Sequence, residues 1–557
     1  MKDAKNTCQS HSNTTKKHIL LLILLWLFLI ATLPWRGFFL LNDDYVYEWN
    51  VRHFAERGLK LHTYTSPTLI FQLILGVMVY AIRQDPSLLR LLTSIFFLLG
   101  TIYMYKLLLL EKITNKKALL LTLIMFFNPL YLHLGFTFMS EPYFLTTIIM
   151  SLYFFARYSQ KMGNENVYAF LTMLFWTFAY LSRQVALFFL PAFFITEFFF
   201  LDKRKLKDYI KYLFPIGIFL VYELLIPKTL VYTQGSLLKS LESLIIPVTY
   251  IVAVERFLKT LFYFGFFTFP IALAYLMQKL RDKAFFNRQF LLPFIGTFCA
   301  MSGVAIYFWK TQTQLMFYIP NILTYAGFLP ASLHMGIKQT FFVNSPVRAQ
   351  ALLTLISMVS FSGLACMGFS KLEGQKVRVK NFIKPENANV ANIFIATVIS
   401  MVTFFLFRSY YDRYILVALP LLLILLGKWM EFKKTASLLA WILTGALAIS
   451  SFAMEHDYLS LIKTVWEIPE KYGIEKLQYY STFEFNAYHR LDAFADAQTM
   501  EEISARAWMP PREDYEFYAS YTPIADFYVE QEINYKSLIS PNFKGSLLLL
   551  KKYPWLE

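Results

Sequence analysis

The stretch HILLLILLWLFLIATLPWRGFFLLNDDYVYEW, residues 18–49, decides the fold class. Residues 18–41 form an apolar run long enough to cross a bilayer, because a helix needs roughly 20 apolar residues to span a hydrocarbon core of about 30 Å. The run is too long for a signal-peptide core and lacks a clear small-residue cleavage site. We therefore expect a cytoplasmic leader (residues 1–18) and an uncleaved membrane helix that exits just before Asp43 and Asp44.

The composition of the whole chain is typical of an integral membrane protein. Of the 557 residues, 57% are hydrophobic, 18% are aromatic and only 16% are charged. Apolar runs recur from Leu20 to Ala453, which argues against a soluble fold. The cysteines Cys8, Cys299 and Cys366 have neither disulfide nor metal-ligand spacing, so we expect them to serve packing.

A change in charge marks one domain boundary. Residues 455–557 contain 10 Lys and Arg against 17 Asp and Glu, a net charge of −7, so the preceding residues must carry +23 to give the total of +16. Short apolar runs, aromatic residues and turn residues alternate in this tail, and they can bury a small core. We expect residues 19–454 to form a transmembrane domain and residues 455–557 a small soluble mixed α/β domain.

Basic loops predict the orientation of the helices, because Lys and Arg concentrate in cytoplasmic loops. We assign seven basic segments to the cytoplasm: the leader and residues 111–117, 156–163, 201–211, 278–289, 371–384 and 427–434. The short apolar segment from Ser66 to Ile82 leaves two alternatives, a crossing helix or an interfacial one. If it crosses, residues 111–117 fall outside, so we favour the interfacial helix and a first outer loop of residues 39–86.

This count gives a polytopic α-helical protein with about 13 transmembrane helices. It brings Glu141 of the SEPYF segment to the same outer face as Asp43 and Asp44. Arg183, the FRSYYDRY segment (residues 407–414) and the C-terminal domain face the same compartment.

Outward carboxylates beside a bilayer suit the activation of a nucleophile, since they accept or orient its proton. Asp43, Asp44 and Glu141 are therefore the candidate catalytic residues. The alternative is structural: Asp43 and Asp44 would form a polar helix end in contact with water, and Glu141 would be an acid at the start of a helix.

Arginines at outer helix ends suit the binding of a lipid phosphate, because a guanidinium stays charged and binds phosphate oxygens in pairs. The candidates are Arg183, Arg408 and Arg413, for which snorkelling at the interface is the alternative. Tyr47 and Tyr411 are candidate substrate contacts, and membership of the interfacial aromatic belt is their alternative. Together these groups suit transfer of a group from a lipid phosphate to an outer acceptor.

Four segments together resemble the GT-C superfamily of membrane glycosyltransferases: NDDYVYEW (residues 42–49), SEPYF (140–144), LSRQVALFFLP (181–191) and YYDRYILVALPLLL (410–423). That superfamily includes protein O-mannosyltransferases, lipid A aminoarabinose transferases and bacterial glycosyltransferases of family 39. The resemblance implies a GT-C fold, a polyprenyl-phosphate sugar donor and inverting transfer. It also implies that Asp43 is the catalytic base and Glu141 the second outer acid. One departure is the lone Pro67 where several branches have a Pro-Pro pair, which leaves the branch undecided.

The expected function is transfer of a sugar to an outer lipid, surface glycan or protein. The expected place is a bacterial inner membrane, with the active site facing outward. A polytopic flippase or transporter for lipid-linked sugars is the alternative, since Glu197 and Glu223 lie near helix ends, and a non-catalytic lipid-binding scaffold is a third. We expect no nucleic-acid partner and predict no cofactor or metal site, while a divalent metal ion stays an open alternative.

Overall fold

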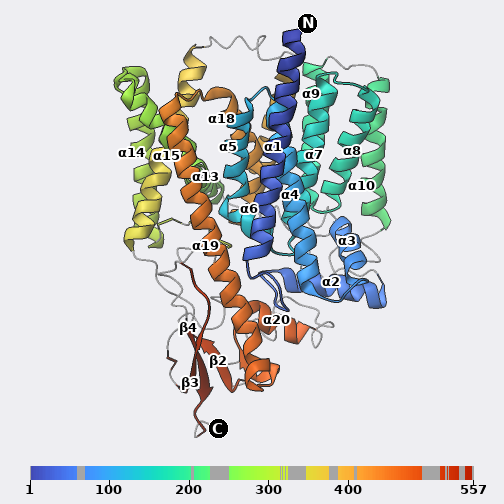
Figure 1. The fold of residues 1–557 in the computed structure, drawn as a ribbon, viewed down its shortest axis with the longest axis vertical. Coiled ribbons are helices and arrows are strands. Elements are labelled where there is room, and N and C mark those ends of the chain that lie inside the picture. Colours follow the sequence, from blue (N-terminus) through green and yellow to red (C-terminus); the bar gives the residue numbers. More distant parts are fainter. Residues whose placement is uncertain are drawn as a thin grey trace.

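The computed structural model shows a helical bundle with a small sheet at one end (Figure 1). It describes residues 2–58, 69–201, 206–225, 250–313, 315–316, 318–319, 321–323, 347–374, 387–406, 410–491, 515–520, 523–524, 526–538 and 546–554.

The helices before the first long gap are α1 (Lys2–Thr32), α2 (Asp44–Arg57), α3 (Ile70–Tyr80), α4 (Pro86–Leu110), α5 (Asn115–Phe126), α6 (Pro129–Leu134), α7 (Ser140–Ser159), α8 (Glu165–Tyr180), η1 (Gln184–Phe188), α9 (Phe189–Phe200), η2 (Leu206–Tyr212) and α10 (Leu213–Leu225). Those that follow are α13 (Tyr250–Arg281), η3 (Ala284–Phe286), α14 (Arg288–Gln312), α15 (Val347–Gly374), α17 (Ala388–Leu406), η6 (Asp412–Ala418), α18 (Leu419–Trp429), α19 (Lys434–Tyr472), η7 (Lys476–Gln478) and α20 (Phe483–Leu491).

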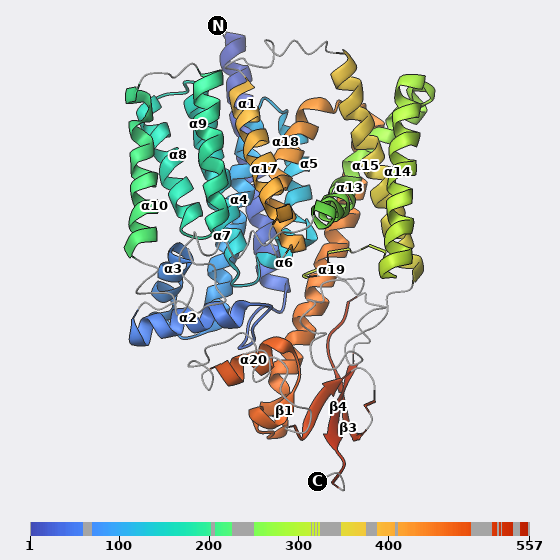
Figure 2. The same ribbon diagram turned by 180° about the vertical axis from the view of Figure 1, so that it is seen from behind.

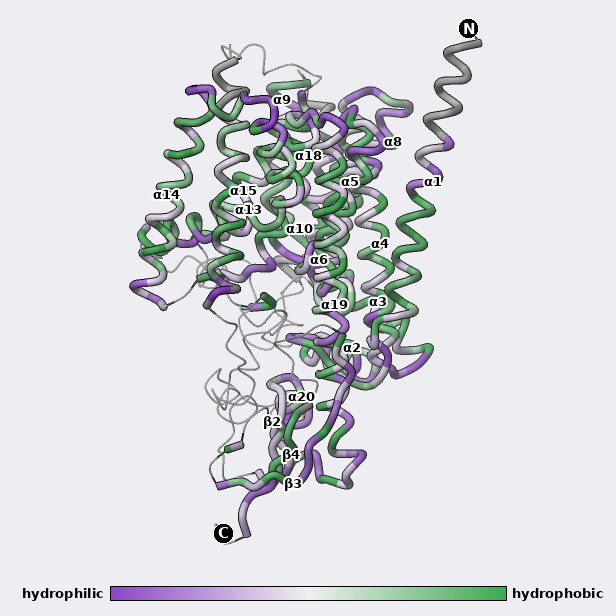
Figure 3. The backbone as a smooth tube through the Cα atoms, turned by 60° about the vertical axis from the view of Figure 1, so that its left-hand side comes forward, coloured by the Kyte–Doolittle hydropathy of each residue, from purple (hydrophilic) through white to green (hydrophobic). Residues whose placement is uncertain are grey.

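Six helices in the described part of the chain are long and apolar enough to cross a membrane. They comprise Asn13–Thr32, Pro86–Leu110, Tyr250–Arg281, Arg288–Gln312, Gln350–Phe369 and Lys434–Tyr472. Shorter apolar helices accompany them, and Figure 3 shows hydrophobic residues concentrated along the bundle. Helices suit these runs because each backbone N–H and C=O finds its partner within the segment. The helical membrane architecture is thus confirmed, whereas the expected count of about 13 spans is not.

The segment between α1 and α4 forms two helices at one end of the bundle (Figures 1 and 2). With 11 residues, α3 is about 16 Å long, which is well short of a hydrocarbon core. A Cβ at Gly76 of α3 would lie 2.6 Å from Val51 Cγ2 of α2 and 2.9 Å from Phe138 Cζ, so the glycine permits close packing here. The interfacial position of this segment and the first outer loop of residues 39–86 stay predictions.

The C-terminal part combines the last long helix with a sheet. Helix α19 runs through the boundary expected at residue 455 without interruption and ends at Tyr472, where Gly473 adopts the left-handed conformation. The four strands are β1 (Tyr479–Tyr480), β2 (Phe517–Ser520), β3 (Phe527–Asn534) and β4 (Ser546–Lys552).

The sheet has the strand order β1-β2-β4-β3, with β1 parallel to β2 and the other neighbours antiparallel. A small aromatic core lies on it, made of Tyr480, Tyr515, Tyr518, Phe527 and Leu550. The sheet and α20 confirm that the tail contains both strands and helix. The extent of a separate domain stays a prediction.

The two ends of the bundle differ in what they carry. The N-terminal end of α1 and the basic turn between α13 and α14 lie at one end, while α2, α3 and the sheet lie at the other (Figures 1 and 2). Helix α2 packs against both α3 and α20, so the segment after the first membrane helix contacts the C-terminal part. This arrangement agrees with a shared face for the acids and the C-terminal residues.

Candidate active site

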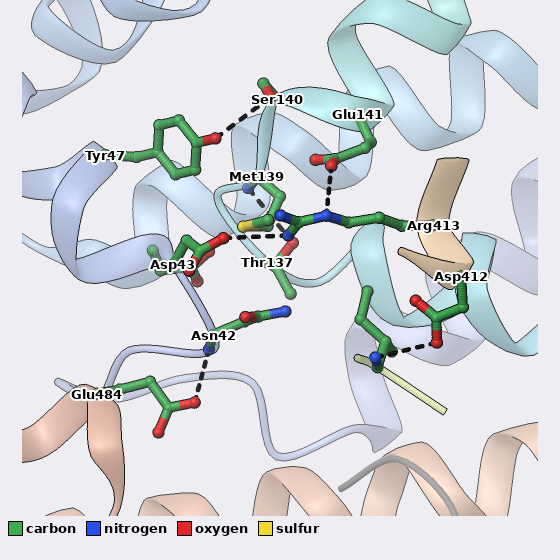
Figure 4. Close-up of polar contacts among 12 residues, drawn as sticks. Asn42, Asp43, Tyr47, Thr137, Met139, Ser140, Glu141, Asp412, Arg413 and Glu484 are labelled. Atoms are coloured by element: carbon green, nitrogen blue, oxygen red, sulfur yellow. Dashed lines mark hydrogen bonds and ion pairs between the residues drawn. The ribbon is translucent and has the colours of Figure 1, made fainter. Parts of the chain in front are cut away.

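A guanidinium links two of the three predicted catalytic acids. Arg413, near the start of η6, places Nη1 3.1 Å from Asp43 Oδ2 and Nε 3.1 Å from Glu141 Oε1 (Figure 4). Asp43 precedes α2 and Glu141 lies in the first turn of α7, so three distant segments meet here. The side chains of Arg413 and Glu141 are each 8% exposed, whereas that of Asp43 is 36% exposed. Asp43 is therefore the acid of the pair most open to a substrate.

A second arginine contacts the same carboxylate. Arg183 Nη1 forms an ion pair with Glu141 Oε1 and lies 3.4 Å from Ser140 Oγ. Two positive charges thus surround Glu141, and Arg413 has a second carboxylate, that of Asp43, as a partner. A charge-assisted network of this kind fixes the guanidinium planes without consuming all their N–H donors.

The predicted tyrosines lie around these groups. Tyr47 of α2 is buried, and its hydroxyl is 3.5 Å from Ser140 Oγ, so it ties α2 to the start of α7. The Tyr411 ring lies 5.0 Å from the guanidinium carbon of Arg413. Tyr414, which the sequence analysis did not single out, lies 5.3 Å from that of Arg183 and 6.0 Å from that of Arg413. Cation–π contacts of this type hold both arginines in place.

Asp44 occupies a different environment from Asp43. It is fully buried, and its Oδ1 accepts a hydrogen bond of 2.8 Å from the Phe138 backbone N–H. Burial outweighs the nearby Arg90 charge and raises the pKa of the Asp44 carboxyl well above its usual range. Gln72 of α3 donates to the Phe138 carbonyl over 2.7 Å. Asp44 is therefore placed to hold the turn that leads into Glu141, and its expected catalytic role stays a prediction.

Arg90 of α4 holds the turn before α2. Its guanidinium donates to the carbonyls of Trp35 (3.1 Å), Gly37 (2.6 Å) and Phe39, and it stacks on the Phe39 ring at 4.0 Å. The side chain is almost fully buried. Its role had a signal in the sequence, because Arg90 is the charged residue of an otherwise apolar run, PSLLRLLTSIFF.

An apolar pocket adjoins the arginines. It is small, with a volume of about 20 Å³, and is lined by Tyr131, Leu134, Glu141, Pro142, Phe144, Leu145, Arg183, Val185, Arg413, Tyr414, Leu416 and Val417. A larger groove of about 660 Å³ lies between α9, η2 and α10, lined by Leu187, Leu190, Pro191, Phe194, Tyr209, Ile210, Tyr212, Leu213 and Ile216. Val185 and Leu187 of the same short helix, η1, each line one of these spaces.

Other buried acids within the helices have partners of their own. Glu197 pairs with Lys211 Nζ at 2.7 Å. Glu455 of α19 lies 2.9 Å from His133 Nδ1, with both side chains fully buried, a contact that no sequence pattern indicated. The Glu223 side chain and Arg408 lie outside what the structure describes. Within the described residues, no group of three His, Cys, Asp or Glu side chains is placed to hold a metal ion.

Residues 67–226 match the family model described as dolichyl-phosphate-mannose-protein mannosyltransferase. The match covers η1 and the helices from α3 to α10, including Glu141 and Arg183, and it confirms the resemblance to the GT-C superfamily. The crystal structure of the Archaeoglobus fulgidus oligosaccharyltransferase in the apo form aligns with a TM-score of 0.44 and 12% identity, over 92% of this chain and 69% of that chain. No curated protein sequence gives a significant match.

Proposed function

On the premise that residues 67–226 carry the GT-C glycosyltransferase pattern, we propose that this membrane glycosyltransferase takes a sugar from a polyprenyl phosphate. The acceptor is a lipid, a surface glycan or a protein outside the cytoplasm, and the stereochemistry is inverting. The observation that carries the proposal is the position of Arg413, between the Asp43 and Glu141 carboxylates and beside an apolar pocket.

The arginines suit the phosphate of the donor. Arg183 and Arg413 both line the pocket, whose other walls are mainly apolar side chains. A phosphate at the mouth of this pocket meets fixed cations, while the pocket itself, at about 20 Å³, is too small for isoprene units. The groove that starts at Leu187 is larger and offers apolar surface for the lipid chain.

Asp43 suits the role of base. In the proposed step the acceptor oxygen or nitrogen attacks the anomeric carbon, and the bond from that carbon to the phosphate oxygen breaks. The electron pair leaves with the phosphate, where the arginines stabilise the charge, and the acceptor proton passes to the Asp43 carboxylate. Attack from the face opposite the leaving phosphate inverts the anomeric configuration.

The test begins with cells that lack the gene. Comparison of their lipids and surface glycans with those of the parent by mass spectrometry identifies the donor that accumulates and the glycan that is lost. The purified protein should then release polyprenyl phosphate from the accumulated lipid when acceptor is present. Movement of the intact glycolipid across vesicles, without release of the sugar, would instead support the flippase alternative.

A further inference from the structure

Asn42, the residue before the two acids, has an unusual backbone conformation. Its φ angle is 55°, in the left-handed region that Asn, Asp and Gly adopt more easily than other residues. The residue is only 2% exposed. A buried left-handed residue needs specific contacts to hold it, and Asn42 has one on its backbone.

That contact comes from the C-terminal part of the chain. The Asn42 backbone N–H donates to Glu484 Oε1 over 3.0 Å, and Glu484 itself is fully buried (Figure 4). Helix α20 carries Glu484 and is fixed by its neighbour Phe485, whose ring lies 5.1 Å from those of Trp466 and Tyr479. Because helix α20 is held by this aromatic packing, the Glu484 carboxylate fixes the direction of the Asn42 peptide N–H.

The Asn42 side chain points the other way. Figure 4 shows its carboxamide directed away from Glu484, into the space between Asp43 and Asp412, with Thr137 drawn between it and Arg413. Nδ2 is buried and has no hydrogen-bond partner within the part of the chain that the structure describes. A buried amide N–H without an acceptor costs about 1–3 kcal/mol, and Asn42 directly precedes Asp43, so a hydroxyl group bound beside that carboxylate would supply the missing acceptor.

We propose that Asn42 is a sugar-binding residue, whose Nδ2 donates a hydrogen bond to a hydroxyl of the transferred sugar, and that Glu484 is the positioning residue that aims it. The proposal rests on the proposed function, because it assumes a lipid-phosphate sugar as donor.

The arrangement favours the sugar over the phosphate as the partner of Asn42. The apolar pocket and Arg183 lie on the Glu141 side of Arg413, where the phosphate and the lipid are proposed to bind. Asn42 lies on the opposite side of Arg413, next to the Asp43 base (Figure 4). A neutral amide beside a base suits a sugar hydroxyl close to the anomeric carbon.

The test compares two lipids in binding to the purified full-length protein: polyprenyl phosphate without a sugar, and the glycosylated lipid that accumulates in cells lacking the gene. Asn42→Gly removes the amide and tolerates the left-handed backbone. This variant should bind the glycosylated lipid about 3- to 10-fold more weakly, the loss of one neutral hydrogen bond, and should bind the sugar-free lipid like the wild type.

Equal weakening for both lipids, or no weakening for either, would overturn the proposal. If the wild type binds neither lipid, the proposed function fails as well. If the wild type binds both and Asn42→Gly matches it, only the role of Asn42 fails.

Variants of Glu484 test its proposed positioning role separately. Glu484→Gln keeps an oxygen acceptor for the Asn42 N–H, whereas Glu484→Ala removes it. We expect Glu484→Ala to raise the KM for the glycosylated lipid without weakening the sugar-free lipid, and Glu484→Gln to restore the wild-type KM. Equal kinetics in the Ala and Gln variants would overturn the positioning role.

Discussion

Arg413 Nη1 lies 3.1 Å from Asp43 Oδ2, although 370 positions separate the two residues in the chain. The contact joins the proposed phosphate site to the proposed base. Because a guanidinium has five N–H donors, Arg413 can bind a phosphate while it keeps its contact with Asp43. The proposed base and the proposed leaving group are therefore held by one side chain.

The first prediction concerns Asp43. Asp43→Asn keeps the shape of the side chain but removes its basicity, and the loss of a general base costs about 10²- to 10⁴-fold in rate. We expect transfer by the purified variant to fall by this factor, while binding of polyprenyl phosphate stays close to wild type. Transfer at the wild-type rate would show that Asp43 is not the base.

Asp44 provides the matched comparison. Asp44→Asn keeps an oxygen acceptor for the Phe138 N–H, so we expect a smaller loss of rate than in Asp43→Asn. Asp44→Ala leaves this buried N–H without its acceptor and should destabilise the fold by about 1–3 kcal/mol. The thermal midpoint in detergent measures the difference, and an unchanged midpoint in Asp44→Ala would contradict the positioning role.

The second prediction concerns the guanidinium of Arg413. Lysine keeps the charge but cannot contact Asp43 and Glu141 through two separate nitrogens, as Nη1 and Nε do. We expect Arg413→Lys to weaken binding of polyprenyl phosphate by about 10- to 100-fold, as one or two charge-assisted hydrogen bonds are lost.

Arg157 serves as the control for this substitution. It lies in the last turn of α7, at the end opposite Glu141, and stacks on Tyr168. Arg157→Lys should leave the affinity for the lipid unchanged. Wild-type affinity in Arg413→Lys, or equal losses in the two variants, would remove the proposed phosphate site.

The membrane architecture could be predicted from the sequence, because a helical chain that crosses a bilayer needs long apolar helices. It also indicated that Asp43, Glu141 and Arg413 share one face, because basic loops constrain which helix ends are outside. The short ion pairs among them depend on packing of α2, α7 and η6, which no local pattern encodes. For the same reason, the sequence could not predict that Asp44 is buried while the adjacent Asp43 is partly exposed.

Contacts with the C-terminal part were also beyond the sequence. Glu484 lies 442 positions from Asn42 and has no motif around it. The boundary expected at residue 455 followed a change in charge, but a helix continues wherever its backbone bonds persist, and α19 extends to Tyr472. A change in the net charge of a segment reflects its exposure to water and does not mark the end of a helix.

The third prediction concerns the side of the membrane. Orientation is best tested at exposed positions, in a chain whose native Cys8, Cys299 and Cys366 are replaced. Cysteine at Glu56, near the exposed end of α2, should react with an impermeant thiol reagent in intact cells. Cysteine at Met162, which is 42% exposed in the turn between α7 and α8, should react only after permeabilisation. The opposite pattern would reverse the assignment of the basic loops to the cytoplasm.

The last prediction concerns pH and Glu484. Burial raises the pKa of Glu484 from the usual 4.5 to about 7, so between these values the folded protein holds a proton that the unfolded chain has released. The stabilisation from this proton is complete below pH 4.5 and is lost as the pH rises through about 7, a change on the order of 3 kcal/mol. Glu484→Gln does not titrate, so its thermal midpoint should fall less than that of the wild type between pH 4.5 and 8. Because all other groups are shared, the difference between the two curves isolates Glu484, and parallel curves over this range would show that its carboxyl titrates normally.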